Sequence, residues 1–148
     1  MRRAYSSANI LDIFVLERAS NTQLRQATPE YKKQLLEAIQ DKKMLTDEPV
    51  VVDGLIRTID VVMTVTMDEK YKFDESRLLS RAREISLDYF NIDNTDFGEQ
   101  FIPQDLIKSV LGETQIRYAE VDNIDKTIHI GFNEIIQLNN LTIIASYI

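Results

Sequence analysis

The apolar and polar positions along the chain alternate most strictly between residues 58 and 67. The odd positions of this segment are all large and apolar, whereas the even positions are mainly Thr and Asp: Ile59, Val61, Met63, Val65 and Met67 against Thr58, Asp60, Val62, Thr64 and Thr66. Alternation of this kind predicts a strand with one buried face and one wetter face. We expect Met63 and Val65 to face the helices of the domain.

Three other segments have the apolar spacing of helices. Thr28 before Pro29 is a helix-start signal, because a hydroxyl caps the first N–H groups and proline has none to satisfy. That helix is predicted to run over residues 29–43. A second helix is predicted over residues 74–90, with Asp74 as its cap, and a third, short helix begins at Pro103 and ends at Gly112.

The remaining segments read as strands or as connections. Residues 10–17 (ILDIFVLE), 115–122 (QIRYAEVD), 127–132 (TIHIGF) and 141–148 (LTIIASYI) are predicted strands. Residues 19–28 are a predicted loop, and residues 45–54 (LTDEPVVVDG) a break punctuated by Pro49 and Gly54. This order predicts an α+β fold, in which a mixed β-sheet packs on the helices 29–43 and 74–90 and on the short third helix. No linker is evident, so residues 1–148 are interpreted as a single domain.

The segment NIDNTDFGEQFIPQDLI, residues 91–107, crowds acidic residues around Gly98. If Gly98 takes position 6 of a calcium-binding EF-hand loop, Phe97 stands at ligand position 5 and the neutral Gln104 replaces the glutamate at position 12. The segment is therefore interpreted as a connector between two helices that turns at Gly98. We expect Phe97, Phe101 and Ile102 to anchor it, and its acids to face water or to cap the helix beginning at Pro103.

Candidate chemistry is sparse. The chain has no cysteine and one histidine, which excludes disulfides, thiolate chemistry and a multi-histidine metal site within one chain. His129 is interpreted as a surface or interface residue, since Ile128 and Ile130 take the other face of the predicted strand. No nucleophile motif or glycine-rich phosphate loop is present in the sequence, so we expect no enzymatic activity, no catalytic residue, no cofactor and no metal.

One alternative stays open, because carboxylate pairs such as Asp93 and Asp96 can act as acid and base in two different environments. The chain would then be a small α+β enzyme or ligand-binding domain that uses the acidic residues of the connector 91–105. A concave pocket lined by Asp93, Asp96 or His129 would favour this alternative.

Charge and hydropathy narrow the range of partners. The net charge of -7 argues against nucleic acid, because binding phosphates needs a basic surface. No apolar run reaches the length that crosses a bilayer, and the first residues lack a secretory pattern. We therefore expect neither nucleic acid nor a membrane as a partner.

Two long stretches, residues 50–111 and 117–143, carry a family resemblance. An alternating strand leads into an amphipathic helix, followed by the connector YFNIDNTDFG, by IPQDLI and by a strand containing RYAEVDN. With ILDIFVLERASNTQL as the first strand, this order resembles the C-terminal domain of the baseplate J-like family, and within it the baseplate wedge proteins of T-even-type contractile-tail phages. The likeness covers nearly the whole chain and consists of packing residues.

The resemblance implies a structural role. Wedge proteins of this family form a ring around the tail hub, and their end domains hold neighbouring wedges together while the ring rearranges as the sheath contracts. It implies contacts of the chain with itself, as a homodimer or in a ring, and with other baseplate wedge proteins. The expected location is the virion tail baseplate, and the host cytoplasm during assembly. Family members are usually longer, so we expect the chain to be the C-terminal piece of a larger protein.

The final segment offers candidates for such a contact. Apolar residues lie on both faces of the predicted last strand, whereas helices are expected to cover only one face of the sheet. The predicted interface residues are Leu141, Ile143 and Tyr147 on one face and Ile144 and Ile148 on the other.

Overall fold

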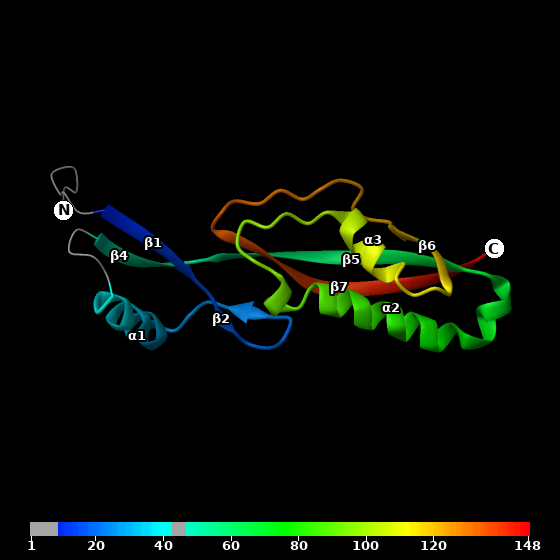
Figure 1. Ribbon diagram of the computed structural model, residues 1–148, viewed down its shortest axis with the longest axis horizontal. Coiled ribbons are helices and arrows are strands. Elements are labelled where there is room, and N and C mark those ends of the chain that lie inside the picture. The colour runs from blue at the N-terminus through cyan, green and yellow to red at the C-terminus, as the bar shows by residue number, and fades with distance from the viewer. Residues whose placement is uncertain (1–8, 43–46) are drawn as a thin grey trace.

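The strictly alternating segment forms β5 (Leu55–Met67), the central strand of the molecule. It pairs in antiparallel fashion with β6 (Ile116–Val121) and in parallel with β7 (Glu134–Tyr147), giving the sheet order β6-β5-β7. The computed structural model describes residues 9–42 and 47–148. It shows an elongated α+β molecule, with a body built on this sheet and an arm formed by the N-terminal elements (Figure 1). The predicted α+β class is confirmed.

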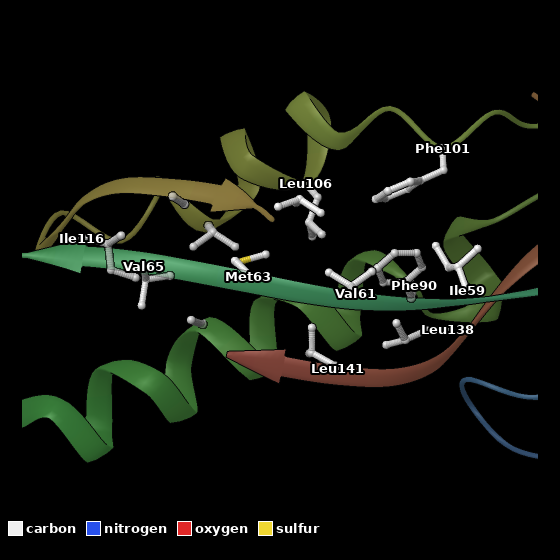
Figure 2. Close-up of a cluster of buried hydrophobic side chains, with 14 of the residues drawn as sticks. Ile59, Val61, Met63, Val65, Phe90, Phe101, Leu106, Ile116, Leu138 and Leu141 are labelled. Carbon is white, nitrogen blue, oxygen red and sulfur yellow. The ribbon is translucent and has the colours of Figure 1, made fainter. Parts of the chain in front are cut away.

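The predicted register of β5 is confirmed. The side chains of Val61, Met63, Val65 and Met67 are fully buried, and Ile59 is nearly so. Helix α2 (Glu75–Tyr89), which follows the short 3-10 helix η2 (Glu69–Asp74), and helix α3 (Pro103–Val110) both pack on this one face of the sheet. Figure 2 shows Leu106 of α3 and Leu141 of β7 meeting the β5 side chains. Burial of apolar surface on one face therefore holds the body together.

An irregularity in β7 shifts its side-chain pattern by one residue. Ile59 pairs with Leu138 but Asp60 pairs with Asn140, so Asn139 is an extra residue on the β7 side. The Asp60 carboxylate accepts hydrogen bonds from the Asn139 side chain and from the Asn140 backbone N–H, both at 3.1 Å. This bulge lets β7 bury apolar side chains on both sides of it, from Leu138 to Leu141, against the same core.

The arm consists of β1 (Asn9–Val15), paired in parallel with β4 (Asp47–Asp53), and of α1 (Pro29–Gln40). Helix α1 begins as predicted, because the Thr28 hydroxyl accepts a hydrogen bond of 3.2 Å from the Tyr31 N–H. It packs along β4 in the arm instead of covering the three-stranded sheet, and none of its residues is buried. It ends at Gln40, and the predicted end at Lys43 lies outside the described residues.

The prediction of a break over residues 45–54 is wrong for residues 47–53. Residues 47–53 form β4, which runs into β5 with only Gly54 between them. Pro49 indicated a break, but proline is tolerated where a strand has a neighbour on one side only, and within residues 9–42 and 47–148 the one strand that pairs with β4 is β1. The three valines 50–52 supply the strand propensity.

The predicted strand 127–132 is also wrong. Within it, Ile128 makes only an isolated bridge to Phe101, with N–H to carbonyl distances of 2.9 and 3.1 Å. The segment thereby fastens the 91–102 connector and does not join a sheet. The predicted loop 19–28 contains half of a small hairpin, made by β2 (Glu17–Arg18) and β3 (Leu24–Arg25).

None of the helices in the described ranges is long and apolar enough to cross a membrane.

Candidate functional site

The face of the three-stranded sheet opposite α2 and α3 is the first candidate site. Within residues 9–42 and 47–148, no helix packs on it. Cross-strand neighbours form rows over this face, for example Glu120–Thr64–Ile144 and Tyr118–Thr66–Ser146. We call it the open sheet face and define it by these residues: Val62, Thr64, Thr66, Tyr118, Glu120, Thr142, Ile144, Ser146 and Ile148.

The open sheet face mixes large apolar groups with threonines. Tyr118 is 57% exposed, Ile144 47% and Ile148 60%. The Thr64 hydroxyl donates a hydrogen bond of 2.5 Å to Asp122, which fixes one polar point on the face. A sheet face on which exposed apolar side chains gather is a candidate surface for a partner.

The five predicted interface residues divide between the two faces of β7, as the sequence predicted. Ile144 lies on the open sheet face, and Ile148, the residue just after β7, continues the alternation through backbone hydrogen bonds with Met67 and Glu69. Leu141 is buried in the core, and Ile143 packs against it, so neither offers a free surface. Tyr147 is partly buried on the helix side, where its hydroxyl donates a hydrogen bond of 2.5 Å to the Glu75 carboxylate at the start of α2. The structure therefore leaves Ile144 and Ile148 as the interface candidates of this strand.

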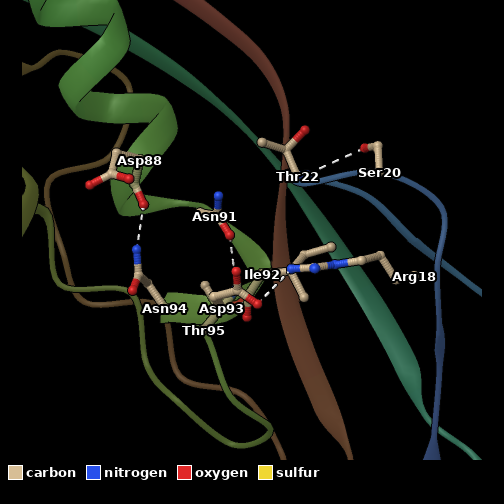
Figure 3. A network of polar contacts seen from close by, with 9 residues as sticks. All are labelled: Arg18, Ser20, Thr22, Asp88, Asn91, Ile92, Asp93, Asn94 and Thr95. Carbon is tan, nitrogen blue, oxygen red and sulfur yellow. Dashed lines mark hydrogen bonds and ion pairs between the residues drawn. The ribbon is translucent and has the colours of Figure 1, made fainter.

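The connector between α2 and α3 is held by backbone and side-chain contacts (Figure 3). It starts with a short 3-10 helix, η3 (Ile92–Asn94). The Asn91 side chain caps η3 by accepting from the Asp93 N–H at 3.0 Å, and Asn94 donates to the Asp88 backbone carbonyl at 2.8 Å. The Asp93 carboxylate accepts from Arg18 at 2.6 Å, so Asp93 ties the connector to the arm side.

The structure buries the predicted anchors of the connector to different extents. Gly98 has a φ of 74°, as its turning role requires, and Phe101 is 2% exposed in the core. Phe97 is partly buried. The prediction of Ile102 as an anchor is wrong: it is the residue just before α3 and is 37% exposed, whereas Leu106 and Val110 of that helix are fully buried.

A cavity of about 360 Å³ beside this connector is the second candidate site. Its apolar wall comes from Ile85 and Tyr89 of α2, from Phe90 and Phe101, and from Ile136 of β7. The rest of the lining is polar: Asp88, Asn94, Thr95, Asp96, Glu99, Gln100 and Ser109. Asp96, one of the three residues whose presence in a pocket would favour the ligand-binding alternative, thus lines the cavity, whereas Asp93 and His129 do not.

Tyr89 lies partly buried in the wall of this cavity, close to the carboxylates of Asp105 and Glu99. Burial raises the pKa of Tyr89, and the charges of Asp105 and Glu99 raise it further.

The other candidate residues have ordinary surroundings. The Asp96 carboxylate accepts a hydrogen bond of 2.8 Å from the Phe97 N–H. His129 is exposed, and its backbone carbonyl accepts from Arg57 at 3.3 Å. Among the described residues, no three His, Cys, Asp or Glu side chains are grouped so that they could hold a metal ion.

The sequence of the connector indicated acidic residues but not the cavity. Its aromatic wall joins Tyr89 and Phe90, at the end of a helix, to Phe101 in the connector and Ile136 in the last strand. The aromatic residues that flank the Asp-rich segment were the only feature of the sequence that indicated this cavity.

No protein-family model matches the chain, and no curated protein matches it significantly.

Proposed function

We propose that the chain is a structural component of a contractile phage-tail baseplate and mediates wedge-to-wedge contacts in the ring around the tail hub. The resemblance of residues 50–111 and 117–143 to baseplate J-like wedge proteins motivates this role. The observation that carries it is the open sheet face, where Tyr118, Ile144 and Ile148 are about half exposed without an intramolecular cover among the described residues. Its partners are then a second copy of the chain and other baseplate wedge proteins, in the virion tail and during assembly in the host cytoplasm.

A contact between two copies through this face is physically reasonable. A two-fold axis brings the same patch together twice, so the apolar groups of both copies leave water at once. Tyr118 is a suitable anchor, since tyrosine is enriched where contacts contribute most to binding. A stable pair needs more than about 1,000 Å² of buried surface in total, which requires most of the face.

The test is sedimentation of the wild-type chain and of Ile144→Asp over a range of concentrations. We expect the wild type to associate and Ile144→Asp to shift toward monomer, because a carboxylate in the contact loses its hydration. The matched control is Ile102→Asp, which places the same change on the helix side of the sheet at 37% exposure. Asp is also a favourable residue at that helix start, so the fold tolerates it.

A wild type that stays monomeric at high micromolar concentration rejects the contact between copies. Equal effects of Ile144→Asp and Ile102→Asp also reject it, because the loss would then not belong to the open sheet face. The wider role is tested by antibody labelling of intact tails, where we expect label at the baseplate end only.

The second candidate is a ligand-binding domain that uses acidic residues of the 91–105 connector. It is favoured by one observation, the cavity beside that connector with Asp96 and Glu99 in its lining. The two candidates are compatible, since the cavity lies on the helix side of the sheet and the open sheet face on the other.

A further inference from the structure

The cavity beside the connector has an aromatic wall with defined geometry. The ring centroids of Tyr89 and Phe90 lie 5.1 Å apart, edge to face, and those of Phe90 and Phe101 lie 5.5 Å apart. Phe90 and Phe101 are almost fully buried, so the core holds both rings in place. The wall is therefore formed before any ligand arrives, which lowers the cost of binding.

The polar side of the cavity carries one sign of charge. Its lining contains three carboxylates, from Asp88, Asp96 and Glu99, and no Lys, Arg or His from the described parts of the chain. Among the described residues, no basic side chain forms an ion pair with any of the three. The nearby Arg18 is paired with Asp93 instead. A concave site with carboxylates of one sign attracts the opposite charge and repels anions.

We propose that this cavity binds an organic cation, an ammonium or guanidinium head group on a small apolar body. The carboxylates match the charge of the head. The partly buried ring of Tyr89 attracts a cation through its negative face and accepts an apolar body, while the almost fully buried Phe90 and Phe101 support the wall from behind. The volume of about 360 Å³ is at the lower end of the range for small-ligand sites, roughly 300–1,000 Å³, and fits one amine or one Arg or Lys side chain. The proposal deepens the second candidate function and does not depend on contacts between copies.

The experiment is a titration of the whole ¹⁵N-labelled chain followed by amide chemical shifts. The probes are benzylamine for a free amine, N-acetylarginine amide for a protein side chain, and benzyl alcohol as the uncharged counterpart. We expect saturable shifts at the amides of Thr95, Phe97 and Gln100 with the two cations, and dissociation constants in the millimolar range or below. Benzyl alcohol is expected to bind at least about tenfold more weakly than benzylamine, since it lacks the charge.

The double variant Asp88→Asn with Glu99→Gln keeps the shape of the lining and removes two charges. We expect it to weaken binding of the cations about tenfold, the size of two partly exposed charge contacts. The matched control is Asp93→Asn, which removes a charge from the same connector but outside the cavity. Its dissociation constants are expected to stay within about twofold of the wild type. The wild-type amide spectrum serves as the reference for the folding of both variants.

The outcomes separate the two sources of the cation and the two proposals. Tighter binding of benzylamine than of N-acetylarginine amide assigns a free amine, and the reverse order assigns the side chain of a partner protein. Equal binding of benzyl alcohol overturns the proposal, as does the absence of saturable shifts with either cation or an equal loss in Asp93→Asn. None of these results depends on Ile144, so sedimentation of Ile144→Asp tests the assembly role separately.

Discussion

The ring of Phe97 lies directly against the backbone of Gly54. A Cβ atom on Gly54 would stand 2.6 Å from Cε1 of Phe97 and 3.1 Å from Cγ of Leu16. Gly54 is the residue at which β4 of the arm becomes β5 of the body, and its N–H donates to the Val15 carbonyl at 3.0 Å. The connector between α2 and α3 therefore packs on the junction between arm and body.

Gly54→Ala should destabilise the fold by about 1–2 kcal/mol, because the added methyl group overpacks the junction and displaces the Phe97 ring. The free energy of unfolding in urea, measured for the wild type, Gly54→Ala, Phe97→Ala and the double variant, checks this prediction. In a Phe97→Ala background the same change should cost less than about 1 kcal/mol, since the closest contact is gone and only the one with Leu16 remains. An undiminished cost in that background would mean that Leu16 or the backbone, and not Phe97, requires glycine here.

Tyr147 should make stability depend on alkaline pH. The hydrogen bond to Glu75, then burial and then the charge of Glu75 raise the pKa of Tyr147 to about 12 from its ordinary value of 10.0. Because the folded pKa is above the unfolded one, the protonated phenol stabilises the fold below pH 10, and this contribution is lost as pH rises from about 10 to about 12.

Chemical unfolding of the wild type and Tyr147→Phe from neutral pH to about pH 12 measures that loss. The stability difference between the two proteins should shrink across the upper part of this range, since the phenylalanine side chain of the variant cannot ionise. The other tyrosines and the lysines titrate in both proteins and cancel in the difference. A difference that stays constant with pH would show that the Tyr147–Glu75 contact does not persist in solution.

Met63→Ala should destabilise the fold by about 2–5 kcal/mol, because it leaves a cavity at a fully buried position in the central strand. The comparison is Thr142→Ala on the exposed side of the neighbouring strand β7, which should cost less than about 1 kcal/mol. Thermal or urea unfolding measures both. A small effect at Met63 with a large effect at Thr142 would mean that the strand register is shifted by one residue.

The parts of the fold that sequence reasoning predicted are those specified by local periodicity and caps. The strand around Met63 and the helix start at Thr28–Pro29 can each be predicted from a few residues that are adjacent in the sequence. The predicted capping residue Asp74 does stand just before α2, but its carboxylate pairs with Arg77 at 2.6 Å instead of bonding the backbone.

The parts that were missed depend on partners distant in sequence. Residues 47–53 become a strand because β1 supplies a parallel neighbour, which Pro49 obscured. Residues 127–132 have the alternation of a strand, yet their backbone is used to hold Phe101 through Ile128. In the candidate site, Asp96 was identified, but the cavity arises only when Tyr89, Phe101 and Ile136 are brought together by tertiary packing.

The parallel pairing of β5 with β7 also determines the order in which the protein can fold. The pairs run from Leu55 with Glu134 to Met67 with Tyr147, so the central strand finds this neighbour only after both helices, the connector and β6 have been synthesised. Closing so long a loop costs chain entropy before any hydrogen bond of the pair forms, and folding slows as the sequence separation of contacts grows. On the ribosome, Val61, Met63 and Val65 therefore lack the β7 part of their cover until β7 has left the exit tunnel, and apolar surface exposed in this way favours aggregation.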